Sequence, residues 1–115
     1  MTVTRADIAA VLSTVEGITG TATPPRSPAP GQGWPEWQQT TPYTLNGNEI
    51  TWLVHVALPN GSPEATVLES DKITQDLMEA LEDLGPIQSV QPTTIVVQQG
   101  GPNGLPCLTV TMTTV

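Results

Sequence analysis

An Asn-Gly pair followed by a strictly alternating apolar run predicts a β-hairpin in the middle of this chain. Asn46-Gly47 is the pair that two-residue hairpin turns favour, because both central positions need a positive φ. One set of alternate residues after it is uniformly apolar: Ile50, Trp52, Val54, Val56 and Leu58. The set between them is mixed: Thr51, Leu53, His55 and Ala57. The pattern predicts a hairpin over residues 40–58, with one face in the core and the other partly covered or exposed.

A first helix is expected before the hairpin, from Arg5 to about Glu16. Thr4 is its N-cap, and Asp7 three residues later completes a capping-box-like pair. Apolar residues recur on one stripe of this helix: Ile8, Val11, Leu12 and Val15. Gly17 follows and is expected to end it.

A second helix is expected after the hairpin. It begins at Ser62-Pro63, an N-cap followed by a proline in the first turn, and ends near Leu84. An alternative start at Ser70-Asp71 would leave residues 64–68 non-helical. One side of this helix is apolar: Ile73, Leu77, Ala80, Leu81 and Leu84. The opposite side is acidic: Glu64, Glu69, Asp76, Glu79, Glu82 and Asp83.

The remaining residues predict two more strands, at 87–99 and 105–115, joined by a glycine-rich loop. Pro92 is expected to break or bulge the first of them, because proline donates no ladder hydrogen bond. The predicted order is therefore α-β-β-α-β-β. We expect a single α+β domain over residues 1–115, in which two helices pack on one face of an antiparallel sheet.

Residues 21–42 carry half of the twelve prolines and predict a long arm or loop. Its candidate interface residues are Arg26, Trp34 and Trp37, since tryptophan and arginine are enriched among residues that dominate interfaces. Asn103, in the glycine-rich loop, is a further interface candidate. Two alternatives stay open: both tryptophans cover the core of their own chain, or the proline-rich stretch binds a proline-recognising groove.

Charge and composition exclude several classes of function. Eleven acidic residues face three basic ones, giving a net charge of −8, which argues against direct binding to nucleic acid or to anionic membrane. A negative surface does allow DNA to pass without adhering. A single cysteine rules out a disulfide framework, and the absence of a long apolar run rules out a membrane span or a secretory signal.

Three groups of residues are candidate chemical sites. The acidic residues Asp76, Glu79, Glu82 and Asp83 are either a cation site or a solvated helix face, and no calcium-type loop accompanies them. His55 and Cys107 lie on predicted strands and form either a dyad or two structural side chains. The segment QQGGPNG lacks the ending of a phosphate-binding loop. We therefore expect no enzyme activity, no cofactor and no metal ion.

Taken together, the layout resembles the tail terminator proteins of long, flexible-tailed bacteriophages, particularly those that infect actinobacteria. The resemblance covers almost the whole chain and has five parts: TRADIAAVLSTVEGITG, GWPEW, ITWLVHVALP, LMEALEDLGPIQSVQPTTI and LPCLTVTMTTV. It rests on layout and not on an invariant motif, and the segment G-x-W-P-x-W is its most distinctive piece.

The resemblance implies a structural virion protein. Tail terminators form a ring, typically a hexamer, which caps the head-proximal end of the tail tube, stops its polymerisation and joins the head. The implied partners are further copies of the chain, the major tail tube protein, the head–tail connector and genomic DNA passing through the channel without specific binding. Asp76, Glu79 and Glu82 are then candidates to border that channel, after assembly in the host cytoplasm. The alternatives are another connector, stopper or tail-completion protein or, in a different class, a small ligand-binding domain or enzyme.

Overall fold

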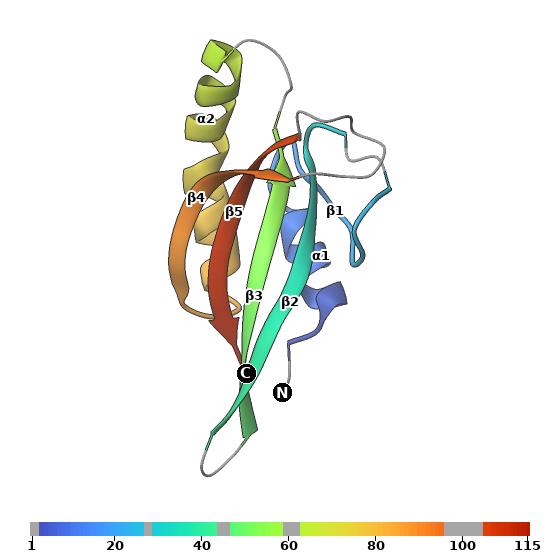
Figure 1. Ribbon diagram of the computed structural model, residues 1–115, viewed down its shortest axis with the longest axis vertical. Coiled ribbons are helices and arrows are strands. Elements are labelled where there is room, and N and C mark those ends of the chain that lie inside the picture. Colours follow the sequence, from blue (N-terminus) through green and yellow to red (C-terminus); the bar gives the residue numbers. More distant parts are fainter. Residues whose placement is uncertain (1–2, 27–28, 44–46, 59–62, 96–104) are drawn as a thin grey trace.

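The computed structural model describes residues 3–26, 29–43, 47–58, 63–95 and 105–115, and within them the chain forms two helices and one five-stranded sheet (Figure 1). In chain order the elements are α1 (Arg5–Leu12), β1 (Thr19–Gly20), β2 (Gln32–Tyr43), β3 (Gly47–Ala57), α2 (Pro63–Glu82), β4 (Ile87–Ile95) and β5 (Leu105–Thr114). The expected α+β class is therefore confirmed at this coarse level.

The sheet is mixed, with strand order β1-β2-β3-β5-β4. β1 runs parallel to β2, whereas the other three pairings are antiparallel. The purely antiparallel sheet and the α-β-β-α-β-β order predicted from the sequence are therefore wrong at this edge. The additional strand forms because Thr19 N–H donates to the Gly31 carbonyl and Thr21 N–H to that of Gly33. Gly31, at a φ of 90°, makes the bend that a residue with a side chain would resist.

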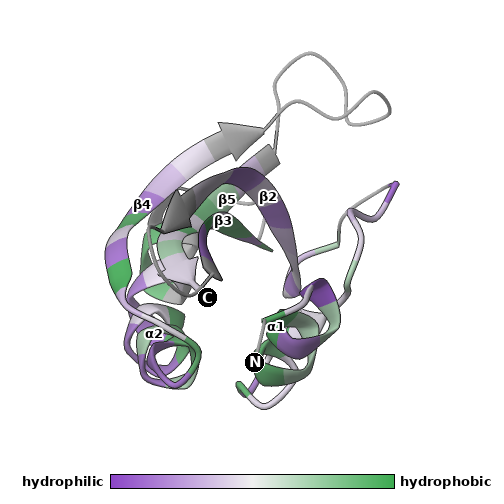
Figure 2. Ribbon diagram, turned by 90° about the horizontal axis from the view of Figure 1, so that it is seen from below, coloured by the Kyte–Doolittle hydropathy of each residue, from purple (hydrophilic) through white to green (hydrophobic). Residues whose placement is uncertain are grey.

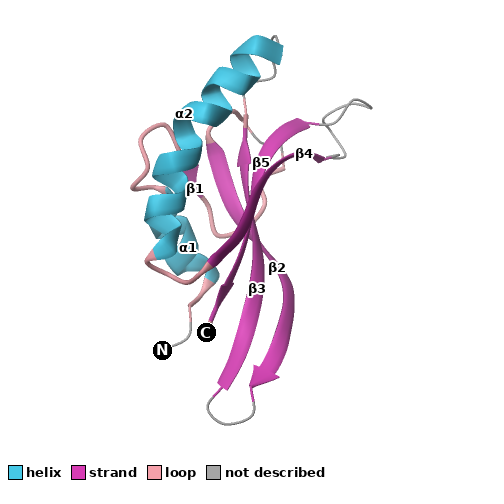
Figure 3. Cartoon of the chain, turned by 90° about the vertical axis from the view of Figure 1, so that its left-hand side faces the viewer, coloured by secondary structure: helices cyan, strands magenta, loops and turns pink. Residues whose placement is uncertain are grey.

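Both helices lie on the same face of the sheet (Figure 3), and a view along the strands places them on its concave side (Figure 2). The alternation predicted for residues 50–58 directs Trp52, Val54 and Val56 toward them. α1 contributes Ile8 and Leu12 to this core, and α2 and β5 supply Ile73, Leu77, Leu81, Leu108, Val110 and Met112. Burial of each such leucine or valine stabilises the fold by about 1.5–3 kcal/mol, so this layer holds the two helices to the sheet.

The helix ends follow local capping chemistry. At α1 the Thr4 hydroxyl accepts from Asp7 N–H while the Asp7 carboxylate accepts from Thr4 N–H, so the predicted capping box is confirmed. α1 ends at Leu12, four residues before the predicted end, and the Ser13 hydroxyl donates to the Ala9 carbonyl there. α2 begins at Pro63 as predicted, and the alternative start at Ser70-Asp71 is wrong.

Half of the expected arm is a strand. An arm over residues 21–42 is wrong for residues 32–42, which belong to β2, so the connecting loop is residues 21–31. Two prolines fit because most of β2 lies at the sheet edge, where β1 pairs only with Gln32 and Gly33. The Gly33 carbonyl points away from β3, toward Thr21. Backbone groups two residues apart on a strand point the same way, so the nitrogen of Pro35 also points away from β3. Its missing N–H therefore removes no hydrogen bond to β3. The Pro35 carbonyl accepts from the Arg5 guanidinium at 3.2 Å, which covers this part of the edge.

Two further local expectations are corrected. Pro92 pairs with Leu108 without a break, because β4 is the other edge strand, and the irregularity in β4 lies between Ile87 and Ser89. The β2–β3 hairpin is confirmed, and it extends past the other strands (Figure 1). Its pairing continues to Tyr43 and Gly47, so Gly47 belongs to β3 and does not form the centre of a two-residue turn. Asn46 and Asn103 lie outside the described residues.

The contact between β1 and α1 gives a first prediction. A Cβ at Gly20 would overlap the Ala9 carbonyl, so Gly20→Ala should lower the free energy of unfolding by about 2 kcal/mol. Gly33→Ala is the matched control, because the nearest atoms to its Cβ stand 3.2 Å away or more and its cost should be smaller. Urea unfolding followed by tryptophan fluorescence measures both, and equal costs would contradict the close approach.

Candidate functional site

A row of polar side chains crosses four strands on the sheet face that points away from the helices. The hydroxyl oxygens of Thr93 on β4 and Thr109 on β5 are 2.6 Å apart. Thr109 Oγ1 lies 2.9 Å from Nδ1 of His55 on β3, and Nε2 of His55 lies 3.3 Å from Oε2 of Glu36 on β2. The register brings the row together, because His55 pairs directly with Thr109. We call these four residues the cross-sheet row.

The cross-sheet row satisfies its buried members in either protonation state of the histidine. With a single proton on Nε2, His55 donates to Glu36, accepts from Thr109, and Thr109 accepts from Thr93. With both ring nitrogens protonated, Nδ1 donates to Thr109 and the hydroxyl bonds reverse direction. No buried side-chain polar atom among the described residues lacks a partner. The row therefore fastens β2, β3, β5 and β4 to one another.

An apolar group flanks this row and includes Cys107, the candidate dyad partner of His55. Trp34, Ala57 and Cys107 are buried together, and the Trp34 ring lies 5.6 Å from that of His55. Both nitrogens of His55 already have partners in the row, so the structure does not bring it to Cys107 as a hydrogen-bonded dyad. Burial raises the pKa of the Cys107 thiol from 9.0 to about 11. The thiol is thus neutral at pH 7, the reverse of what a thiolate nucleophile needs.

The cross-sheet row also has the chemical composition of a hydroxyl–imidazole–carboxylate triad. Its geometry suits a structural role better, because Thr109 is buried and shares its hydroxyl with Thr93. Two described clefts, one at Leu84 to Pro86 and one between Glu16 and Asp76, are lined by other residues. Within the described residues, the arrangement cross-links neighbouring strands.

The acidic side of α2 is where the sequence placed it. Asp76, Glu79 and Glu82 are exposed, and Glu79 accepts a hydrogen bond from the Gln75 amide at 3.1 Å. Asp76 and Glu79, with Glu16 from the turn that follows α1, line a shallow cleft of about 360 Å³. No three histidine, cysteine or acidic side chains of the described ranges are grouped as metal ligands. The arrangement is a negative surface that extends from α2 toward α1.

The structure separates the residues that the arm was expected to hold together. Arg26 is exposed in the loop of residues 21–31. Trp34 is buried in its own chain at 4 % exposure, against Ala57 and Cys107, and its role at an interface stays a prediction. Trp37 is 53 % exposed, because the register shift after it leaves the indole at the sheet edge, where Nε1–H donates to Thr40.

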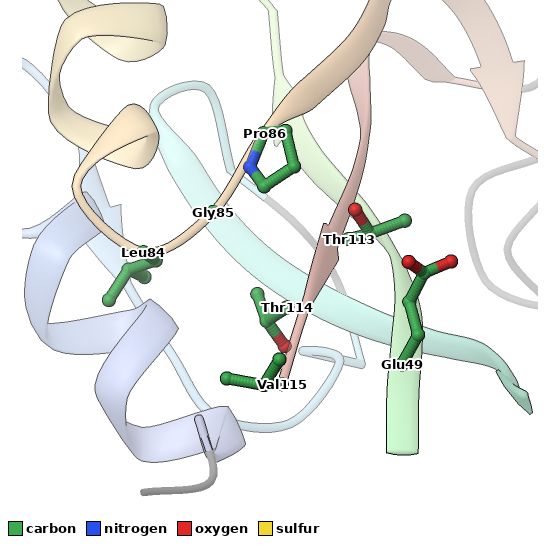
Figure 4. A pocket seen from close by; sticks show the side chains of 7 residues that line it. All are labelled: Glu49, Leu84, Gly85, Pro86, Thr113, Thr114 and Val115. Carbon is green, nitrogen blue, oxygen red and sulfur yellow. The ribbon is translucent and has the colours of Figure 1, made fainter. Parts of the chain in front are cut away.

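Sequence reasoning missed both the cross-sheet row and the cleft at Leu84 to Pro86. The row had a signal in the alternating threonines of β5, since Thr109, Thr111 and Thr113 share one face. What the sequence did not contain was the pairing of β5 between β3 and β4. The cleft is lined by Glu49, Leu84, Gly85, Pro86, Thr113, Thr114 and Val115, which come from three separate segments (Figure 4). No local pattern joins them.

Comparisons with known proteins assign no family: no family model matches the chain, and no curated protein is similar enough to count as a relative. In the described part of the chain, neither helix has the length and apolar character needed to cross a membrane. Function therefore has to be argued from the surfaces of this chain and from its sequence resemblance.

The cross-sheet row gives a second prediction. Thr109→Val should lower the free energy of unfolding by about 1–3 kcal/mol, because it leaves buried His55 without a partner at Nδ1. Thr111→Val, on the same strand and face but outside the row, is the matched control and should change stability by less than about 0.5 kcal/mol. Denaturant midpoints measure both variants. A Thr109→Val variant as stable as the unmodified chain would contradict the stabilising role of the cross-sheet row.

Proposed function

We propose that this chain is a phage tail terminator. In this proposal several copies, most simply six, form a ring on the head-proximal end of the tail tube, stop its growth and present the surface that joins the head connector. DNA passes through the channel without specific binding. The observation that carries the proposal is a sheet whose two edge strands are only partly covered by the described residues, with an exposed tryptophan on one of them, in a chain whose layout resembles that family.

The sheet edges support assembly between copies. Among the described residues, β2 and β4 have no strand on their outer sides beyond the two-residue contact of β2 with β1. Uncovered strand edges with exposed apolar side chains are sites at which chains associate. The β2–β3 hairpin, which extends beyond the last pair of β3 with β5 at Ile50 and Thr114, adds a projecting element of the kind that reaches a neighbour.

Charge supports the passage of DNA in preference to its binding. Asp76, Glu79 and Glu82 present exposed carboxylates along α2, and the chain carries a net charge of −8. Such a surface repels phosphate, and the repulsion acts over roughly 8 Å at physiological salt. It therefore operates only where DNA passes close to the wall, as it does in a channel.

The location of the ring is the third prediction. Electron microscopy of tails carrying this protein should show it as a ring at the head-proximal end, and tails made without it should be abnormally long or unable to join heads. A single copy, or no ring at that end, would exclude the terminator. A ring on the head side that is retained when tails are absent would instead identify a connector or stopper.

The acidic side of α2 gives the fourth prediction. Replacing Asp76, Glu79 and Glu82 with lysine changes the charge by about six units per copy, so the isolated assembly should acquire salt-sensitive binding to duplex DNA. The control is the charge-conserving set Asp76→Glu, Glu79→Asp and Glu82→Asp at the same positions, which should acquire no DNA binding. Unchanged DNA passage and no DNA binding in the α2 variant would place that helix on the outer wall.

A further inference from the structure

Two of the three basic residues of the chain lie on the same side of the molecule. Arg5, at the start of α1, donates to the Pro35 carbonyl on the outer side of β2. Arg26 is exposed in the loop of residues 21–31, which follows β1 at the same edge of the sheet. Figure 2 shows α1 and this loop at the β2 end of the sheet, whereas α2 lies under β4. The third basic residue, Lys72, belongs to α2.

The loop presents a positive charge between prolines. Pro24, Arg26 and Pro30 are all exposed, and we call them the loop surface. Residues 21–31 contain no acidic side chain, so this surface is positive in a chain whose net charge is −8. Both ends of the loop are fixed, because the N–H groups of Thr21 and Gly31 donate to backbone carbonyls of β2 and β3 at 2.8 Å. Prolines and fixed ends reduce the conformational freedom that the loop loses on docking.

α2 carries a surface of the opposite sign. Val67, Asp71, Met78 and Glu82 recur at spacings of four, seven and four residues, which places them on one stripe of the helix. Val67 is 58 % exposed, and the carboxylates of Asp71 and Glu82 are exposed as well. We call this stripe the outer flank of α2. It combines apolar and acidic side chains, as the loop surface combines apolar and basic ones.

The outer flank and the loop surface lie at opposite ends of the sheet. Asp76, Glu79 and Ala80 are on the other side of the apolar stripe of α2, where they line the cleft shared with Glu16. The outer flank therefore faces away from α1 and past β4, the last strand of the sheet (Figure 2). β2, with the two residues of β1 on its outer side, is at the other end. A neighbour displaced across the strands consequently meets one surface with the other.

The charges follow the same order along the strands on both surfaces. Arg5 is bonded to β2 two residues closer to the β2–β3 hairpin than Gly33, the residue of β2 to which the loop is bonded. α2 ends and β4 begins toward that hairpin (Figure 1), so Glu82 is nearer to it than Asp71. A sideways displacement without a shift along the strands therefore brings Arg26 toward Asp71, the farther of the two carboxylates.

From these observations we infer that the loop surface of one copy docks on the outer flank of α2 of the next copy, with Arg26 paired to Asp71. Charge complementarity selects a second copy as the occupant, because other approaches of chains with a net charge of −8 bring like charges together. Val67 packs against the prolines of the loop, and the outer side of β2 comes to lie beside that of β4.

The contact is heterologous, with different surfaces on its two sides, and such contacts build rings when the rotation closes. The inference rests on the proposed function, because it supplies the subunit contact of that ring. Asp76 and Glu79 lie outside the contact, on the side of α2 that faces α1, so they remain candidates to border the channel.

Charge reversal in the purified full chain tests the contact. Arg26→Asp and Asp71→Arg should each raise the apparent Kd of self-association by about tenfold, because each places like charges opposite one another. The double variant restores the pair with reversed polarity, so its Kd should return to within about threefold of that of the unmodified chain. Mass photometry and sedimentation velocity measure the Kd, and circular dichroism confirms folding.

Lys72→Asp and Asp76→Arg are the matched controls. They change the charge of the chain by the same amounts as the two test variants, at exposed positions of α2 outside the outer flank. Each should leave the Kd within about twofold of the unmodified value, because neither charge lies in the contact.

The possible results separate the contact from the proposed function. Rings that Arg26→Asp weakens no more than Lys72→Asp does, or single variants that the double variant does not rescue, would overturn the contact and leave the terminator standing. If Asp71→Arg prevented only the attachment of rings to tails, the outer flank would belong to a different protein of the tail or head, and the second copy would be overturned as its occupant. A chain that stays monomeric at every concentration and on tails would overturn both.

Discussion

β3 is buried on both faces, and the positions of the other elements follow from that. Toward the helices it presents Val54 and Val56, which are fully buried against α1, α2 and β5. On the other face His55 anchors the cross-sheet row. A strand in this position needs a partner on each side and cover on each face. The hairpin supplies β2, β5 inserts next to it, and the helices cover the apolar face.

The edges of the sheet are guarded only in part. At β2, Pro35 has no N–H to donate, and its carbonyl already accepts a hydrogen bond from the Arg5 guanidinium. The same guanidinium lies 5.7 Å from the centre of the Trp52 ring. At β4, Pro92 has a similar effect. These devices discourage indiscriminate strand pairing. Beyond them, the Trp37 side chain stays exposed at the edge of β2.

Local chemistry allowed much of the fold to be predicted, and contacts between distant residues account for the rest. The capping box at Thr4, the alternation after residue 47 and the start of α2 at Pro63 all depend on neighbours in sequence. β1 depends on hydrogen bonds to Gly31 and Gly33, which no local pattern predicts.

The prolines of residues 21–42 indicated a loop, yet at a sheet edge a proline is compatible with a strand. The two tryptophans were both interface candidates, and the structure separates them for a related reason. Successive side chains on a strand alternate between its two faces, and Trp34 and Trp37 are an odd number of residues apart. Trp34 therefore lies with His55, while Trp37 lies on the other face at the register shift. The acidic side of α2 was predictable from helical spacing alone.

The central claim is that the two sheet edges join copies of this chain, and hydrogen–deuterium exchange on the assembled and monomeric full chain tests it directly. The account predicts that assembly slows exchange along the outer side of β2, at residues 36–40, and along the outer side of β4, at residues 88–93. The centre of β3 should not change, because it is already buried in the monomer. Slower exchange confined to α2 or to the loop at residues 21–31, with both edges unchanged, would contradict the claim.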